Sequence, residues 1–238
     1  MCIRDRPRGF LKKIFIASLI ANTLQYGLTY TGLSFIDASA AVLLVQTEVP
    51  FGVIFAYFML KEKPTIRSLV GIAIAFIGVY LLTGSPNLDG KFVGVSLVII
   101  GSGIWALGQV LVKPLSKEIS PLALVAWMAL FSGPILIALS AIFDGNTINY
   151  FKTANFNSWL IAIYLGFIMQ PITYGCFYYV IKNNPIYKVL PIVTMGIPLT
   201  GLLAAIFLLG EEPTKELFIG GAVTVSYTHL TLPTICSV

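Results

Sequence analysis

The fold of this chain is decided by the stretch Leu43–Thr65, LLVQTEVPFGVIFAYFMLKEKPT. Between Leu43 and Leu60 the one charged side chain is Glu48, which stands two residues before Pro50 in an otherwise apolar run. A run of this length and composition is typical of a helix that crosses a lipid bilayer. A carboxylate at that depth is costly unless it faces the interior of a helix bundle or a polar cavity. The stretch therefore predicts a helical membrane protein and marks Glu48 as a candidate functional residue.

The composition extends this prediction to the whole chain. The 238 residues are 57% hydrophobic and 11% charged, whereas a soluble domain is usually about a quarter charged. Apolar segments of about 20 residues recur along the chain, which is typical of an all-α membrane protein with several spans. The formal net charge of +5 reflects loop lysines and arginines, so we expect no nucleic-acid partner.

Both ends of the chain differ from the rest. The opening MCIRDR and the closing VSYTHLTLPTICSV resemble translated adapter sequences, so we predict non-native tails at residues 1–7 and 226–238. Cys2, Cys236 and the one histidine, His229, fall in these tails. Cys176 is then the one remaining cysteine, and we expect no intrachain disulfide.

Charged residues and Gly/Pro clusters divide the chain into eight predicted spans. They are Ile14–Ile36, Ala38–Leu60, Ile66–Thr83, Phe92–Lys113, Pro121–Phe143, Ser158–Ile181, Ile186–Leu209 and a shortened Glu216–Val225. The loops on one side hold Arg8, Lys12, Lys13, Lys61, Lys63, Arg67, Lys113, Lys117, Lys182 and Lys188, against Lys91, Lys152 and Lys215 on the other. Positive charge accumulates on the cytoplasmic side, so we expect the first side to be cytoplasmic.

An internal repeat is visible at a nearly constant offset of 148 to 149 residues. Tyr26–Leu33 (YGLTYTGL) matches Tyr174–Ile181 (YGCFYYVI), and Leu60–Thr65 (LKEKPT) matches Leu209–Thr214 (LGEEPT). The copies lie five spans apart, an odd number, so they face opposite ways across the membrane. Inverted-topology repeats are the plan of many secondary transporters, with the substrate site near the bilayer midplane.

The residues that carry the repeat also resemble a known family. Tyr30–Leu82, Trp105–Leu115 and Ile172–Thr214, with the loops Lys61–Lys63 and Gly210–Glu212, are similar to the EamA family of the drug/metabolite transporter superfamily. The resemblance implies ten helices in two five-helix inverted repeats with cytoplasmic termini. Residues 8–84 would be the last three helices of the first repeat and residues 85–225 the second repeat, so the chain would be a fragment without the first two helices. The second half resembles bacterial exporters of O-acetylserine and cysteine.

The candidate transport path combines polar groups at mid-span with paired prolines. Glu48 has two interpretations: a substrate or proton-coupling carboxylate, or a structural group satisfied by a neighbouring helix or a wet vestibule. Pro50 and Pro198 match in the repeat and interrupt corresponding helices, although membrane helices also carry prolines for packing. A single polar side chain can equally be an interhelical contact. The predicted path residues are Gln46, Glu48, Pro50, Trp105, Gln109, Gln170, Tyr174, Thr194 and Pro198.

These patterns favour a secondary transporter that exports small polar metabolites or amino-acid derivatives across the bacterial inner membrane. Transport would proceed by alternating access, with protons as the coupling ion. The expected partners are a small-molecule substrate and the lipid bilayer, and homodimer formation is left open. The alternative is a drug or nucleotide-sugar exchanger of the same superfamily, followed by a channel or a scaffold. An enzyme is disfavoured because the sequence has no His-x-x-x-x-His pair, aspartate dyad or Ser–His set. We expect no cofactor, catalytic residue or metal site.

Overall fold

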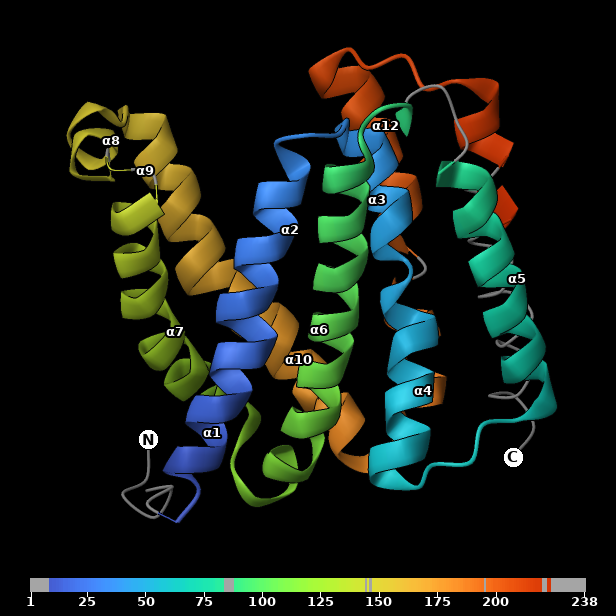
Figure 1. Ribbon diagram of the computed structural model, residues 1–238. Helices are drawn as coiled ribbons and strands as arrows, with labels where there is room; N and C mark the ends of the chain where they lie inside the picture. The colour runs from blue at the N-terminus through green and yellow to red at the C-terminus, as the bar shows by residue number, and fades with distance from the viewer. Residues whose placement is uncertain are drawn as a thin grey trace. The chain divides into compact units, whose positions relative to one another are not determined.

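The computed structural model of the protein describes residues 9–83, 88–143, 145, 147–194, 196–219 and 222–223. The predicted tails, 1–7 and 226–238, lie outside the described residues, as does the end of the span predicted at Glu216–Val225. All regular structure within the described ranges is helical (Figure 1). The prediction of an all-α protein is therefore confirmed for this part of the chain.

The helices follow the predicted spans, with several shifted ends. They are α1 (Leu11–Ser18), η2 (Leu19–Leu24), α2 (Gln25–Leu33), α3 (Ala38–Val45), α4 (Glu48–Leu60), α5 (Ile66–Thr83), α6 (Phe92–Glu118), α7 (Pro121–Phe143), α8 (Thr147–Thr153), α9 (Phe156–Ile163), η4 (Tyr164–Met169), α10 (Gln170–Asn183), α11 (Ile186–Thr194) and α12 (Gly196–Leu209). Helix α6 continues past the predicted end at Lys113 with Pro114 inside it, and α8 is not among the predicted helices.

Four helical segments are long and apolar enough to cross a membrane, judged by length and composition within the described residues. They are Ala38–Leu60, Phe92–Glu118, Pro121–Phe143 and Phe156–Asn183. Their lipid-type surface is evident on Phe156–Asn183, where Phe167 is 80% exposed and its neighbours Leu165 and Ile168 are also exposed. Such a surface is stable in a bilayer and not in water. The remaining predicted spans stay predictions.

The segment Ala38–Leu60 changes its backbone pattern at Gln46 and Thr47. The N–H of Gln46 donates to the carbonyl of Leu43 (3.2 Å) and that of Thr47 to Leu44 (3.0 Å), which are tight three-residue bonds. Pro50 has no N–H to offer the carbonyl of Gln46, which instead accepts from the N–H of Val49 (3.2 Å). The interruption between α3 and α4 thus lies four residues before the proline.

Two other helical segments contain π-helical stretches, which mark local rearrangements of backbone bonding. Stretch η2 separates α1 from α2, and η4 separates α9 from α10. In the second, the N–H of Gln170 donates to the carbonyl of Leu165, five residues back. Pro171 comes directly after it and cannot donate to Phe167, so the sequence supplies a local reason for the altered bonding.

The chain forms two compact units, each described by itself. Unit 1 comprises the described residues of 1–23 and 111–183, and unit 2 those of 24–110 and 184–238. In unit 1, α7 packs against α1 and α10. The rings of Phe15 and Phe131 meet edge to face at 5.5 Å, and the buried Tyr178 hydroxyl donates to the Met128 sulfur at 3.8 Å.

In unit 2, α3 and α4 follow one another along one line between α6 and α5 (Figure 1). Helix α3 packs against α12, and α4 against α11. A buried cluster that includes Leu44, Val98 and Leu217 forms the apolar centre. Small residues allow close approach: a Cβ atom on Gly94 of α6 would come within 2.7 Å of the Phe35 and Ile36 side chains.

We expect Gly94→Ala to destabilise unit 2. The added methyl would contact the Cβ of Phe35, which cannot rotate away, and overpacking of this kind costs about 1–3 kcal/mol. Thermal unfolding of the purified protein in detergent would measure the change.

The matched control is Gly27→Ala in α2, where an added Cβ meets no atom within 4 Å. That variant should be neutral or more stable by about 0.5–1 kcal/mol, because alanine is the better helix former. Equal stability of the two variants would show that the approach at Gly94 is not close.

Candidate functional site

Three consecutive polar side chains occupy the interruption between α3 and α4. Gln46 is 0% exposed, Thr47 1% and Glu48 5%. The Thr47 hydroxyl donates to the carbonyl of Leu44 at 2.8 Å, so this side chain serves the backbone of the interruption. Glu48 begins α4 and lies in its first turn.

Two buried amides lack hydrogen bonds among the described residues. Neither the oxygen nor the nitrogen of the Gln46 side chain has a partner there, and the same holds for Gln109 on α6, which is 1% exposed. Leaving a buried polar group unsatisfied costs about 1–3 kcal/mol. Each amide offers one acceptor and one donor group to water or to a polar ligand, which is the chemistry expected of a transport path.

Within unit 2, the neighbouring helices α6 and α11 carry further predicted path residues. Helix α6 packs on α4, because a Cβ on Gly103 would be 3.5 Å from the Phe51 ring. On α11, Thr194 is 1% exposed and its hydroxyl donates to the carbonyl of Leu190 at 2.9 Å. Leu190 in turn fills the space in front of Gly52 on α4.

The nine predicted path residues are therefore divided between the two units. Unit 2 holds Gln46, Glu48, Pro50, Trp105, Gln109, Thr194 and Pro198, of which Trp105 is half-buried and the others are buried. Gln170 and Tyr174 lie half-buried in unit 1. The predicted path stays a hypothesis for the set; its buried polar side chains lie between α3 and α4 and on α4, α6 and α11.

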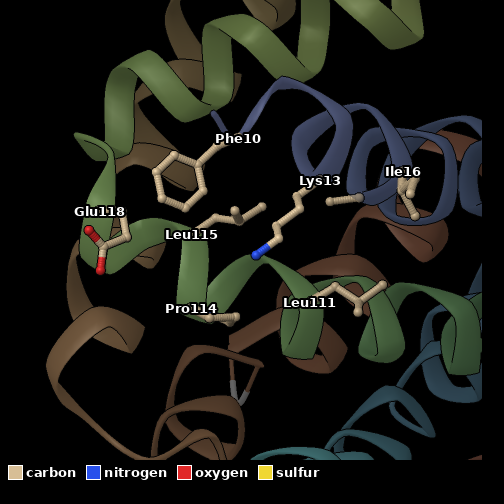
Figure 2. Close-up of a pocket in the computed structure, with 8 residues that line it drawn as sticks. Phe10, Lys13, Ile16, Leu111, Pro114, Leu115 and Glu118 are labelled. Carbon is tan, nitrogen blue, oxygen red and sulfur yellow. The ribbon is translucent and has the colours of Figure 1, made fainter. Parts of the chain in front are cut away.

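One cavity of about 480 Å³ lies elsewhere, in unit 1, and no predicted path residue lines it. Phe10, Lys13, Ile16 and Ala17 contribute from the start of the chain, and Leu111, Pro114, Leu115 and Glu118 from α6. Figure 2 shows the Lys13 side chain extending between the two groups, with Glu118 at the edge. The lining is mostly apolar, and Lys13 lies 5.8 Å from the Phe10 ring centroid.

The structure reveals two carboxylates whose contacts sequence reasoning missed. Glu211 accepts hydrogen bonds from the backbone N–H groups of Ala38 (2.8 Å) and Ser39 (2.9 Å), at the start of α3. Glu62 accepts one from the N–H of Ile186 (2.7 Å), at the start of α11. Both carboxylates thus bind the free donors of a helix N-terminus. The available signal was the repeated loop LKEKPT/LGEEPT, which by itself indicates the repeat and not the partners of its glutamates.

Equivalent backbone turns aim these two carboxylates. Helix α4 is followed by Lys61, whose φ is +59°, and α12 by Gly210, whose φ is +68°. The next N–H in each loop reaches back six residues: Glu62 donates to Ala56 (3.3 Å) and Glu211 to Ala205 (3.2 Å). This bond and the left-handed residue are the features of a Schellman-type helix end. The sequence therefore places both glutamates directly after a fixed turn.

The Glu211 contact is reinforced by charge. Asp37, at the N-cap of α3, pairs with Lys91 at 3.1 Å. Burial opposes ionisation of Glu211, but hydrogen bonds from Ser39 and Ala38 and the charge of Lys91 together lower its pKa below the ordinary value. Because the pKa is lowered in the folded state, this contact stabilises the fold above the ordinary pKa of glutamate. The contribution is lost as the pH falls through the lowered value.

Long apolar helices with exposed apolar surfaces define a multi-pass membrane protein. The model of the EamA-like transporter family matches residues 3–84 and 92–230. The chain belongs to this family.

Individual relatives agree with the family match. A protein of Escherichia coli (strain K12) named "Probable amino-acid metabolite efflux pump" is 26% identical over 234 residues, covering 94% of this chain and 78% of that protein. One of the same name from Salmonella typhimurium (strain LT2) is 28% identical, with 92% and 76% covered. A solved crystal structure shares the fold, with a TM-score of 0.61, 16% identity, and 93% and 76% covered.

These matches confirm the sequence-based resemblance and its broad functional meaning. The relatives are named as transporters and efflux pumps, so the expectation of a membrane transporter rather than an enzyme is confirmed.

Glu48→Gln tests whether the buried carboxylate acts in transport. The substitution keeps the size of the side chain and removes its ability to bind and release a proton, so membrane insertion should persist. Loss of a hydrogen bond that involves a charged group is worth about 1.5–3 kcal/mol, so we expect transport to fall roughly 10- to 150-fold or to lose its pH dependence. Substrate release measured over a range of external pH is the readout.

Glu118→Gln at the exposed end of α6 is the matched control and should leave transport unchanged. Identical release and pH profiles for Glu48→Gln and the unsubstituted protein would make Glu48 a structural residue.

Proposed function

We propose that the protein is a secondary transporter that exports small, amino-acid-related metabolites across the bacterial inner membrane. It works by alternating access between two inverted repeats. The observation that carries this proposal is a set of paired contacts. For each contact between the repeats there is a second one, formed by the matching residues of the opposite repeats. Such pairing is expected where two like halves surround one central site.

The helix contacts of unit 2 support this pairing. At the repeat offset, α3 corresponds to α11 and α4 to α12, so the packing of α4 on α11 corresponds to that of α12 on α3. The same holds for single residues. Gly52 faces Leu190, and Gly201 faces Val42. Gly52 matches Gly201 and Val42 matches Leu190 at offsets of 149 and 148.

Local conformations support it as well. The rings of Tyr26 and Tyr30 are 5.7 Å apart, as are those of Tyr174 and Tyr178. The π-helical stretches η2 and η4 occupy similar places in the corresponding segments. The distribution of lysine and arginine predicts opposite orientations of the two repeats across the membrane. The matching local conformations are what such a repeat would produce.

The substrate class follows from the buried polar groups and from the names of the relatives. Glu48 offers carboxyl oxygens for a substrate ammonium group or a coupling proton. The amides of Gln46 and Gln109 offer donors and acceptors for carboxylate and hydroxyl groups. Small zwitterionic metabolites fit this set, and two relatives are named as amino-acid metabolite efflux pumps. The resemblance of the second half to O-acetylserine and cysteine exporters selects cysteine-pathway metabolites as the first candidates.

The test is metabolite release from bacteria that lack their own amino-acid exporters. Cells that express the protein should release cysteine-pathway metabolites several-fold faster than cells with an empty vector. Dissipating the proton gradient should slow the release if protons are coupled to transport. Release is measured in the medium by mass spectrometry, with membrane content of the protein determined in parallel.

Normal membrane content without added release of any amino-acid-related metabolite would contradict the proposed substrate class. Release carried by brief unitary currents, rather than by slow saturable flux, would contradict the carrier mechanism.

A further inference from the structure

We propose that Glu62 and Glu211 close the two ends of the transport path in alternation. Each carboxylate ties a loop of one repeat to the first turn of a helix in the other. The inner closure is defined as Glu62 with the Ile186 N–H, and the outer closure as Glu211 with the N–H groups of Ala38 and Ser39. This inference rests on the proposed alternating access and names residues that perform it.

The two closures correspond at the repeat offset. Glu62 and Glu211 are 149 residues apart, and their partners Ala38 and Ile186 are 148 apart. The loop of the first repeat therefore binds the second repeat, and the loop of the second binds the first, at 2.7 Å and 2.8 Å respectively. A cap made within one repeat would stabilise only that repeat, whereas these two bonds join the halves that must separate.

The two closures lie at opposite ends of the Ala38–Leu60 segment: the inner closure at the end of α4 and the outer closure at the start of α3. Glu62 follows α4 and reaches the start of α11, among Lys61, Lys63 and Lys188 on the expected cytoplasmic side. Glu211 follows α12 and reaches the start of α3, beside Lys91 on the expected outer side. Opening of one end requires its carboxylate to leave the helix N-terminus, while the other bond can hold its end shut.

The residues that directly precede the two helix starts do not cap them with their own side chains. Pro185, which precedes α11, has no side-chain oxygen to accept an N–H. Asp37, which precedes α3, makes no side-chain cap and pairs with Lys91 instead. Ser39 and Ile186 are 1% and 0% exposed, so both helix starts are covered while the closures are formed. A charged hydrogen bond at a helix N-terminus is strong enough to hold a conformation and weak enough to exchange.

Cysteine labelling at the covered helix starts tests the proposal. The reporters are Ser39→Cys and Ile186→Cys, which keep the backbone N–H donors, each in the full chain with Cys2, Cys176 and Cys236 changed to serine. A membrane-impermeant maleimide is applied to the outer face of spheroplasts or to inside-out vesicles. Glu211→Ala should raise labelling at the Ser39→Cys reporter about fivefold and lower it at the Ile186→Cys reporter. Glu62→Ala should do the opposite.

Glutamine variants and two controls distinguish loss of the carboxylate contacts from a loss of folding. Glu62→Gln and Glu211→Gln retain an acceptor without its charge, so their labelling should be intermediate, and they replace the alanine variants if those do not reach the membrane. Glu118→Gln and Glu212→Gln alter exposed carboxylates and should leave both reporters unchanged.

Opposite changes at the two reporters would support alternating closures. Exposure of only the local reporter, with the distant one unchanged, would overturn the proposal and leave both glutamates as helix caps. Unchanged labelling at both reporters would overturn it too. The labelling needs no substrate, so a failure of metabolite release would count against the proposed substrate class without deciding the closures.

Discussion

A bilayer offers no hydrogen bonds to the backbone, and the structure of this protein depends on how it meets that constraint. Every interruption of a membrane helix must be satisfied from within the protein. At Gln46 the carbonyl loses its usual donor because Pro50 has none, and the N–H of Val49 replaces it at 3.2 Å. Thr47 and Glu48 are buried at this rearranged turn, so buried polar side chains and the break in the helix occur at the same place.

The backbone groups at the helix ends also need partners within the protein, and here side chains supply them. The first N–H groups of α3 and α11 need acceptors, and carboxylates from distant loops supply them. The turns at Lys61 and Gly210 fix where those loops point. A left-handed conformation favours glycine, so Lys61 adopts it against its own preference. The backbone bond from the Glu62 N–H to the Ala56 carbonyl maintains the turn there.

Prediction from sequence worked where local chemistry sets the boundary. The helices Ile66–Thr83 and Pro121–Phe143 begin and end where charges and prolines placed them. It is less accurate at Pro114, because the predicted span ends at Lys113 whereas α6 continues to Glu118. Helix Thr147–Thr153 was missed because seven residues carry too little periodicity to distinguish a short helix from a loop. The family resemblance was carried by motifs spread over both halves, and the family match confirms it.

The sequence by itself determined that this protein is helical, lies in a membrane and belongs to a transporter family, because length, hydropathy and repeated motifs are properties of the linear chain. It also singled out Glu48, since a carboxylate inside an apolar span is anomalous without any coordinates. Only the tertiary structure decided which donors Glu62 and Glu211 bind. Their partners lie 124 and as many as 173 residues away in sequence. Folding alone brings such distant groups together, and no local pattern records the pairing.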